Sequence, residues 1–410
     1  MSLSTIPIII DAITALGNRV TVADVSTRTG LPLQSSIISL NHIAAKTKAV
    51  LEVSGTGNIL YAFPADLKNA YYGNGVGQLL RKVLSIVGSV LAYLVRVSFG
   101  ILLIASVVTL VILFAITIMV GMFAADGSDG DFGDLDFDVD FNFCDVSNLI
   151  MFFAWWNHDV DGGTVTYFGK QVEVRERGFL SNCFAFLFGD GNPNKGFEEK
   201  TWQYIADLIR INNGAIIAEQ LAPYSGAVGS EMNAVFPTLA RFEGVPEVTE
   251  TGNIVYLFPS MLVTSAQRHF LEVPDYAEEQ QWKFTNGPIS KLDLVFYFAW
   301  ANLAGWYGLS LVIDHQHFFE QYATIVHAAL GYSVFFLTVP ILRCFVNAFR
   351  NALIDYRNGI RRQAAEALAS LPNTEKIRES QAYGQNLVYL CEQEAVYSTD
   401  RDLIEQQFEN

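Results

Sequence analysis

Residues 83–123 read VLSIVGSVLAYLVRVSFGILLIASVVTLVILFAITIMVGMF, and Arg96 is the only charged residue among them. A helix that crosses the hydrocarbon core of a bilayer needs about 20 apolar residues, and this stretch is roughly twice that long. Residues 100–122 alone are sufficient for one span. The sequence therefore predicts an integral membrane protein, with a membrane helix or a helical hairpin at residues 79–122.

Arg96 divides this stretch, because a charged side chain costs several kcal/mol when it lies in hydrocarbon. Residues 79–97 could form a second short span that turns near Ser98. They could instead form a helix that lies among the lipid headgroups. In both interpretations the apolar stretch is interrupted close to Arg96.

A second membrane element is predicted at residues 291–348, where apolar stretches at 292–313 and 323–348 are joined by a short polar turn. Pro340 lies inside the second stretch and is expected to kink it. The turn has no Lys or Arg, whereas several arginines follow Pro340: Arg343, Arg350, Arg357, Arg361 and Arg362. This contrast is the positive-inside pattern, which places the C-terminus in the cytoplasm. A basic pair before the first apolar stretch places the N-terminus there too.

The composition agrees with a membrane protein, because 51% of the residues are hydrophobic and only 17% are charged, where soluble domains have about 25%. The net charge of −16 disfavours nucleic-acid partners, since binding to phosphate backbones needs a basic surface. The cysteines have no CxxC spacing and indicate neither a disulfide framework nor a zinc site: Cys144, Cys183, Cys344 and Cys391. No cofactor is predicted.

Residues 1–70 are predicted to form a small helical module closed by a β-hairpin. An apolar helix comes first, and a second helix is expected to begin at Thr21, which is a good N-cap residue. A third helix is predicted at residues 33–45, where apolar residues recur at helical spacing. Two alternating strands follow, at 49–53 and 58–63, around a Gly-rich turn. Three helices followed by a two-stranded wing is the winged-helix pattern.

The end of this module is repeated in a second module, predicted at residues 180–265. Ten residues are identical at a constant offset of 195 over the sixteen positions that begin at Glu52 and Glu247. Such self-similarity predicts an internal duplication. The wing aromatics recur in pairs, which we expect to be exposed and to contact partners: Tyr61 and Phe63, Tyr256 and Phe258. Because related modules usually share a compartment, an even number of spans between them is expected, which favours the hairpin.

A winged helix raises the question of DNA binding. In the first module the counterpart of a recognition helix, residues 33–45, contains no Lys or Arg. In the second module this counterpart, residues 231–242, has a single arginine and contains Pro237. Base readout depends on side chains such as arginine at base edges. Protein contacts are therefore the favoured function of both modules, and nucleic acid is a disfavoured partner.

Residues 123–157 form an acidic and aromatic linker that ends in an apolar segment typical of an interfacial anchor. Asp136, Phe137 and Asp138 belong to a stretch in which Asp and Phe alternate as in an extended strand. Clustered carboxylates can bind calcium, but the spacing of an EF-hand is absent. A strand that binds a partner is the favoured interpretation.

The turn of the second hairpin contains the chain's only grouping of histidines with a carboxylate. His315, His317 and Glu320 are weak candidates for a metal site, because a further ligand would have to come from the next helix. A polar turn with two interfacial histidines is the simpler interpretation.

The loop FGDGNPN at residues 188–194 has the strongest turn signal in the chain. It lacks the motifs that identify phosphate-binding loops. The loop is predicted to be structural or part of a partner surface. We expect partner contacts there at three residues: Phe188, Asp190 and Asn192.

Several of these motifs together resemble a family of membrane proteins from cyanobacteria and chloroplasts. They are FGDGNPN at 188–194, AEQLAPY at 218–224, the paired YxFP wings, and the SFG sequence that follows Arg96. The resemblance covers residues 20–360 and implies a cyanobacterial source and a thylakoid or plasma-membrane location. Plant members are sometimes labelled iron–sulphur cluster biosynthesis proteins. The dispersed cysteines give that label little support, because such clusters are held by several cysteines together.

The predicted fold class is mainly α with small β-hairpin wings, combining membrane helices, two winged-helix-like modules and an amphipathic helical tail at residues 349–410. The leading hypothesis is a non-enzymatic membrane scaffold or assembly factor that binds other membrane proteins and copies of itself. A membrane-tethered DNA-binding regulator and a homo-oligomeric channel or transporter are the alternatives. Transport is disfavoured because the predicted spans contain few polar residues: Asn302, His327 and Thr338.

Overall fold

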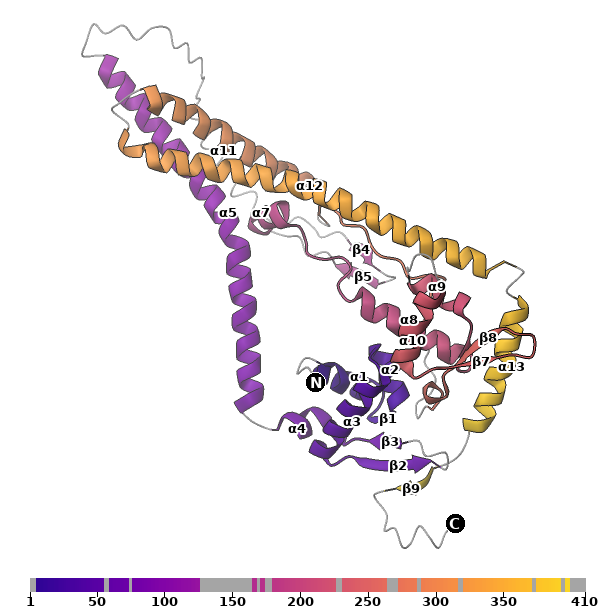
Figure 1. The fold of residues 1–410 in the computed structure, drawn as a ribbon. Helices are drawn as coiled ribbons and strands as arrows, with labels where there is room; N and C mark the ends of the chain where they lie inside the picture. Colours follow the sequence, from indigo (N-terminus) through magenta and orange to yellow (C-terminus); the bar gives the residue numbers. More distant parts are fainter. Residues whose placement is uncertain are drawn as a thin grey trace. The chain divides into compact units, whose positions relative to one another are not determined.

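The computed structural model of the chain is mostly helical, with small antiparallel sheets (Figure 1), so the mainly α fold class is confirmed. The described residues are 5–54, 59–73, 76–125, 164–167, 170–173, 179–225, 231–263, 272–285, 289–315, 320–370, 374–391 and 395–398. The chain divides into two compact units. The module unit consists of Met1–Val83, Asn194–Gln281 and Asn351–Asn410, and the bundle unit of Leu84–Pro193 and Trp282–Arg350.

The first module contains α1 (Thr5–Ala15), β1 (Arg19–Thr21), α2 (Val22–Thr29), α3 (Leu33–Thr47), β2 (Val50–Ser54), β3 (Ile59–Ala62) and α4 (Leu67–Tyr72). As expected, Thr21 caps α2. The Thr21 hydroxyl accepts a hydrogen bond from the Asp24 amide, and the Asp24 carboxylate accepts one from the Thr21 amide. This capping box fixes where α2 begins, and Gly30 ends the helix in the left-handed region.

The second module repeats this order of elements as α8 (Phe197–Ile211), β6 (Ala215–Ile216), α9 (Ala218–Ser225), α10 (Glu231–Phe242), β7 (Val245–Val248) and β8 (Ile254–Leu257). A short 3-10 helix, η1 (Pro259–Met261), follows. The strand order is β1-β3-β2 in the first module and β6-β8-β7 in the second. In both modules the last strand therefore lies in the middle and pairs antiparallel with two neighbours.

The two modules also agree in register and in one turn. The same wing positions pair across the two hairpins: Val53 with Ile59 in the first, and Val248 with Ile254 in the second. Before the first strand of each module, Asn18 and Gly214 have positive φ values. Their carbonyl oxygens accept hydrogen bonds from the amides of Phe63 and Phe258. The wings are thus tied to the rest of each module in the same way.

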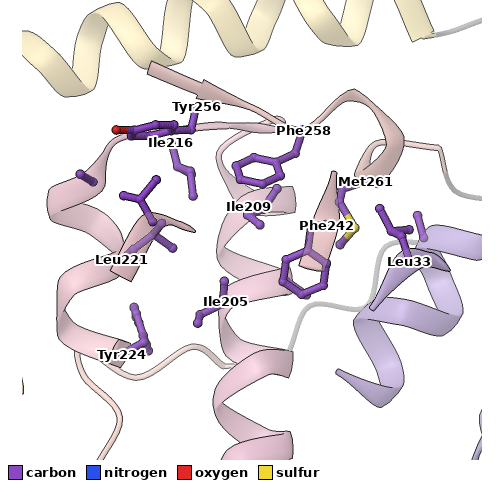
Figure 2. Packing of buried hydrophobic residues seen from close by; sticks show 14 of the residues in the cluster. Leu33, Ile205, Ile209, Ile216, Leu221, Tyr224, Phe242, Tyr256, Phe258 and Met261 are labelled. Carbon is purple, nitrogen blue, oxygen red and sulfur yellow. The ribbon is translucent and has the colours of Figure 1, made fainter. Parts of the chain in front are cut away.

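The wing aromatics are buried, so the prediction that they are exposed is wrong. The exposed fraction is 1% for Tyr61 and 6% for Tyr256, and Phe63 and Phe258 are buried as well. Alternate residues of a strand face opposite sides of a sheet, and these aromatics face the helices of their own module. The Tyr61 hydroxyl donates to Asn41 Oδ1 (2.7 Å), and Figure 2 shows Tyr256 and Phe258 among the apolar side chains of the second module.

The C-terminal tail contributes to both modules. Helix α13 (Thr374–Cys391) packs against β6. Strand β9 (Ala395–Ser398) pairs antiparallel with β2 and extends the first sheet to the order β1-β3-β2-β9. The helical pattern of the tail sequence gave no sign of β9, because four residues are too few to establish a strand pattern.

Helix α5 (Val76–Ala125) is a single helix of 50 residues, so the predicted hairpin with a turn near Ser98 is wrong. The Ser98 hydroxyl donates to the Val95 carbonyl oxygen (2.8 Å) within the helix. The guanidinium of Arg96 lies 5.5 Å from the centre of the Phe184 ring. A cation is attracted to the face of an aromatic ring, so this charge is accommodated without a break in the helix.

Two more long helices complete the bundle unit: α11 (Ile289–His315) and α12 (Glu320–Leu368), the latter running through Pro340 and beyond this unit. Three helices in the described part of the chain are long and apolar enough to cross a membrane. The qualifying stretches are Ile86–Met119, Leu292–Ile313 and Tyr322–Leu368. The bundle unit also contains α7 (Phe179–Phe188) and a two-stranded sheet of β4 (Thr164–Tyr167) and β5 (Lys170–Glu173).

The long helices pack through two apolar clusters, one of which also includes α7. The three helices contribute Leu103, Leu292 and Phe336 to the cluster at α7, and Leu110, Trp306 and Val326 to the other. Residue numbers rise from the first cluster to the second on α5 and α11, and fall on α12. Helices α5 and α11 are therefore parallel to each other and antiparallel to α12, as Figure 1 also shows.

Candidate interaction site between the two modules

The junction of the two modules is formed by an ion pair, several hydrogen bonds and shared apolar side chains. Helix α2 of the first module lies against α8 of the second. Arg210 Nη2 donates to Asp24 Oδ1 at 2.7 Å, and the exposed fractions of these side chains are 13% and 2%. The other carboxylate oxygen of Asp24 caps α2. One carboxylate thus serves both the helix start and the junction, and its charge is balanced across the interface.

Arg241 is the single arginine of α10, the helix considered above for DNA readout. Its Nε donates to the Gly30 carbonyl oxygen of the first module at 2.8 Å. Its guanidinium lies 4.3 Å from the centre of the Trp202 ring. Burial lowers the pKa of Arg241, and Glu198 and Glu199 oppose that shift. This side chain is committed to a protein contact.

Gly30 allows the two modules to approach closely. Its φ of 71° lies in the left-handed region, which other residues rarely adopt. A Cβ at this position would lie 2.7 Å from the Glu199 carbonyl oxygen and 3.1 Å from Trp202 Cβ. Both the backbone conformation and the contact therefore require glycine.

Further hydrogen bonds and apolar side chains complete the junction. Gln203 Nε2 donates to the Arg28 carbonyl oxygen (2.9 Å), and the Thr21 hydroxyl donates to the carbonyl oxygen of Val263 (2.7 Å). Ala23 and Leu33 of the first module belong to the apolar core of the second. In Figure 2, Leu33 lies on its own helix beside Met261 and Phe242. Because the core is shared, the two modules form one structural body.

Helix α13 docks on the second module through a carboxylate bound in the wing turn. The Glu379 carboxylate accepts hydrogen bonds from the Thr251 hydroxyl (2.6 Å), the Asn253 amide (2.9 Å) and the Thr249 hydroxyl (3.0 Å). These hydrogen bonds lower the pKa of Glu379. Lys376 Nζ and Glu219 Oε1 form an ion pair at 2.6 Å. The tail is thus held by specific polar contacts.

The same helix covers the outer face of the second sheet. Ile377, Tyr383 and Leu387 pack against an apolar group on the sheet, formed by Ala215, Ile217, Val255 and Leu257. The Ser380 hydroxyl donates to the Ala215 carbonyl oxygen (2.8 Å). At Gly384, a Cβ would lie 2.8 Å from the Asn212 carbonyl oxygen. Without α13, this apolar face of the sheet would be exposed.

Several of the arginines that predicted the orientation of the chain in the membrane also make structural contacts. In the module unit, Arg357 and Arg361 bind the Glu279 carboxylate. Burial alone would raise the pKa of Glu279, but the two guanidinium groups bring it below its ordinary value. In the bundle unit, Arg343 donates to the carbonyl oxygens of Ala185 (2.8 Å) and Phe284 (2.6 Å). In each unit these arginines therefore bind α12 to other parts of the same unit.

The loop residues predicted as a partner surface belong to the bundle unit, and the buried wing aromatics belong to the module unit, so the structure does not assign them to one site. Phe188 is 43% exposed and packs edge-on against Phe99, with ring centres 5.1 Å apart. Asp190 Oδ2 accepts a hydrogen bond from the Thr285 hydroxyl (3.1 Å). Asn192 is exposed.

The remaining predicted sites lie largely outside the described residues. This applies to the backbone of Asp136, Phe137, Asp138 and His317, and to the side chains of His315 and Glu320. Over the described ranges, no three His, Cys, Asp or Glu side chains are grouped so that they could hold a metal ion.

Sequence analysis missed the contacts that make the junction. The capping spacing identified Thr21, but nothing marked Asp24 as the partner of Arg210, which is 186 positions away. Glu379 was also missed. The recurrence of Thr56-Gly57-Asn58 as Thr251-Gly252-Asn253 was the available signal that the wing turn has a polar role.

The fold and junction define a mainly α-helical protein with three helices able to cross a membrane and two small modules that share one core. The chain is 31% identical to an Arabidopsis thaliana protein described as "Uncharacterized protein At5g03900, chloroplastic", over 97% of this chain and 79% of the relative. The chain belongs to the family of that chloroplastic protein. No protein-family model and no solved structure matches the chain.

The family resemblance found in the sequence is confirmed as far as a chloroplast protein family. The relative's description mentions no iron–sulphur cluster. A chloroplastic relative together with three apolar helices is compatible with a thylakoid membrane.

Proposed function

We propose that the protein is a non-enzymatic integral membrane scaffold or assembly factor that acts through protein contacts of two duplicated, winged-helix-like modules. The observation that carries this proposal is the bond from Arg241 to the Gly30 carbonyl oxygen. The one arginine of the helix that would read DNA is half-buried against the other module. Because the helix that would bind DNA contacts the other module instead, this module is suited to protein–protein contacts in an assembly.

Both finer features of the fold support this proposal. The shared order of elements, strand order and wing register favour an internal duplication. Three helices followed by two paired strands in each module support the proposal of a winged-helix-like fold. A duplicated module presents similar outer surfaces on both copies, apart from the surface buried in the shared core.

The proposed location is a thylakoid membrane, or a plasma membrane if the source is a cyanobacterium. Arginines beyond the last span favour cytoplasmic or stromal N- and C-termini. Its partners are other membrane proteins and further copies of the chain.

The two alternatives have less support. A membrane-tethered DNA-binding regulator would have to free Arg241 from the junction. A channel or transporter would need a polar path, whereas three polar side chains of the bundle are linked to each other: Trp306 Nε1 donates to Ser106 Oγ (2.8 Å), and Ser106 Oγ donates to Asn302 Oδ1 (3.1 Å). Such bonds between helices are a means of packing in membranes.

The test is to purify the tagged full-length protein from its native membrane in mild detergent and identify co-purifying proteins by mass spectrometry. A foreign protein in fixed stoichiometry is expected. Ile38→Ser, at an exposed apolar position on α3 of the first module, should reduce its recovery. Ser35→Ala, at an exposed polar position on the same helix, should not. Preparations that contain only this chain, together with salt-dependent binding of duplex DNA, would overturn the proposal.

A further inference from the structure

The outer edge of β7 has no neighbouring strand in the described part of the chain. The second sheet has the order β6-β8-β7, and over the described residues no strand pairs with the other side of β7. All four residues of β7 are exposed, with exposed fractions of 57% for Val245 and 65% for Val248. The unpaired amide and carbonyl groups of an edge strand can pair with another strand.

In the first module the equivalent edge is occupied. Strand β2 is the counterpart of β7, and β9 pairs with it so that Glu52 lies opposite Ser398 and Val53 opposite Tyr397. Three positions of β2 have the same residues as β7: Val50, Glu52 and Val53 match Val245, Glu247 and Val248. The chain thus has two similar edge strands, β2 and β7, and β9 pairs with β2.

The backbone groups that β7 offers follow from its pairing with β8. The Thr249 amide donates to the Asn253 carbonyl oxygen (2.8 Å) across the wing turn. Because alternate residues of an edge strand direct their polar backbone groups to opposite sides, Val248 and Pro246 direct theirs outward. Proline, which has no N–H, is tolerated on an edge strand in this orientation. Val248 therefore offers both a donor and an acceptor, at the position where β2 has Val53.

Apolar side chains at the edge of β7 resemble those at the edge of β2, where β9 binds. Val248 pairs with Ile254, which is 47% exposed, and both lie on one face of the hairpin. The matching pair of the first module, Val53 and Ile59, lies next to the position of Tyr397.

We propose that the β7 edge binds the C-terminal strand of a second copy of this chain, antiparallel to β7 and with its Tyr397 opposite Val248. Strand β9 is four residues long, and its pairing with β2 shifts register between Val53 and Ser54. A strand held over so few residues can be exchanged between copies. The pairing links the modules of neighbouring chains, and it stands independently of the scaffold function.

The first test is disulfide trapping in the full-length protein in detergent. The double variant Val248→Cys and Tyr397→Cys should form a dimer that reductant dissolves. The matched control, Val53→Cys and Tyr397→Cys, should form a bond within one chain and remain a monomer. Each single variant controls for the native cysteines. Absence of the dimer overturns the proposal, and so does a dimer in Val248→Cys alone, which would mean that β7 pairs with β7.

The second test is particle mass. The full chain should be a dimer or larger, and a chain ending at Cys391, which lacks β9, should lose the association. Val248→Lys should have the same effect, because a charge blocks edge pairing. Phe236→Lys, at an exposed apolar position on α10, should leave the mass unchanged. Retention of the dimer after truncation overturns the proposal.

Discussion

The two carboxylate oxygens of Asp24 make different contacts: one accepts the hydrogen bond that caps α2, and the other binds Arg210. Removing one partner of a buried ion pair costs about 3 kcal/mol or more, since the other charge is left buried. We expect Arg210→Met to lower the free energy of unfolding by about 3 kcal/mol. The combined variant Asp24→Asn and Arg210→Met should lose less, because no charge remains. Urea unfolding followed by circular dichroism measures both, and equal losses would contradict this account.

Gly30 and Gly17 form a matched pair, because both have positive φ but only Gly30 meets the second module. We expect Gly17→Ala to lower the free energy of unfolding by about 1 kcal/mol through backbone strain alone. Gly30→Ala should lose about 3 kcal/mol, because its methyl group also overpacks the junction. Thermal unfolding of both variants tests the difference. Equal effects would mean that the close approach at Gly30 contributes nothing.

Sequence reasoning at single residues succeeded where the signal is local. Thr21 was recognised as a cap because the residues that complete the capping box are neighbours in the chain. The wing tyrosines Tyr61 and Tyr256 were placed on the wrong side. Strand alternation says which residues share a face, but not which face is covered, and that depends on helices elsewhere in the module. The bond from Arg241 to Gly30 spans 211 positions and has no local signature.

Among helices and strands, α13 is the element whose docking depends on one titratable group. The pKa of Glu379 lies below its ordinary value of 4.5. A group with a depressed pKa stabilises the fold fully above the ordinary value, and this contribution is lost as the pH falls through the folded value. The docking of α13 should therefore persist at neutral pH and weaken below about pH 4.5.

Glu379→Gln tests this docking. We expect faster amide hydrogen exchange in α13 at neutral pH, because a neutral amide accepts weaker hydrogen bonds than a carboxylate. Between about pH 5 and pH 3 the variant should lose less stability than the natural protein. Glu375→Gln, at an exposed position one turn earlier, is the control and should leave exchange unchanged. Identical exchange in the two variants would show that the wing turn does not hold the tail.

The long helices were largely predictable from the sequence, whereas the continuity of α5 through Arg96 was not. The apolar stretches at 292–313 and 323–348 correspond to α11 and α12, because sustained apolar composition is a strong signal. At Arg96 the same reasoning predicted a turn that does not exist. A charge is costly in hydrocarbon unless it has a partner, and the partner, Phe184, lies 88 positions further along.

Across the whole chain, the direction of the long helices makes a prediction about sidedness. If α5 crosses the membrane, Ala125 at its end and Asn192 in the loop after α7 lie on opposite sides. We expect Ala125→Cys and Asn192→Cys to react with a membrane-impermeant maleimide from opposite sides of sealed vesicles. Labelling of the natural protein measures the reaction of the exposed Cys344, and this background is subtracted. Labelling of both positions from one side would mean that α5 does not cross.

The parallel course of α5 and α11 has a consequence for counting passages through the bilayer. Both helices lead away from the α7 end, so α5 ends and α11 begins at opposite ends of the bundle. The two modules share one core, and a shared core does not lie on both sides of a bilayer. The number of passages between the modules is therefore expected to be even, although α5 is a single helix.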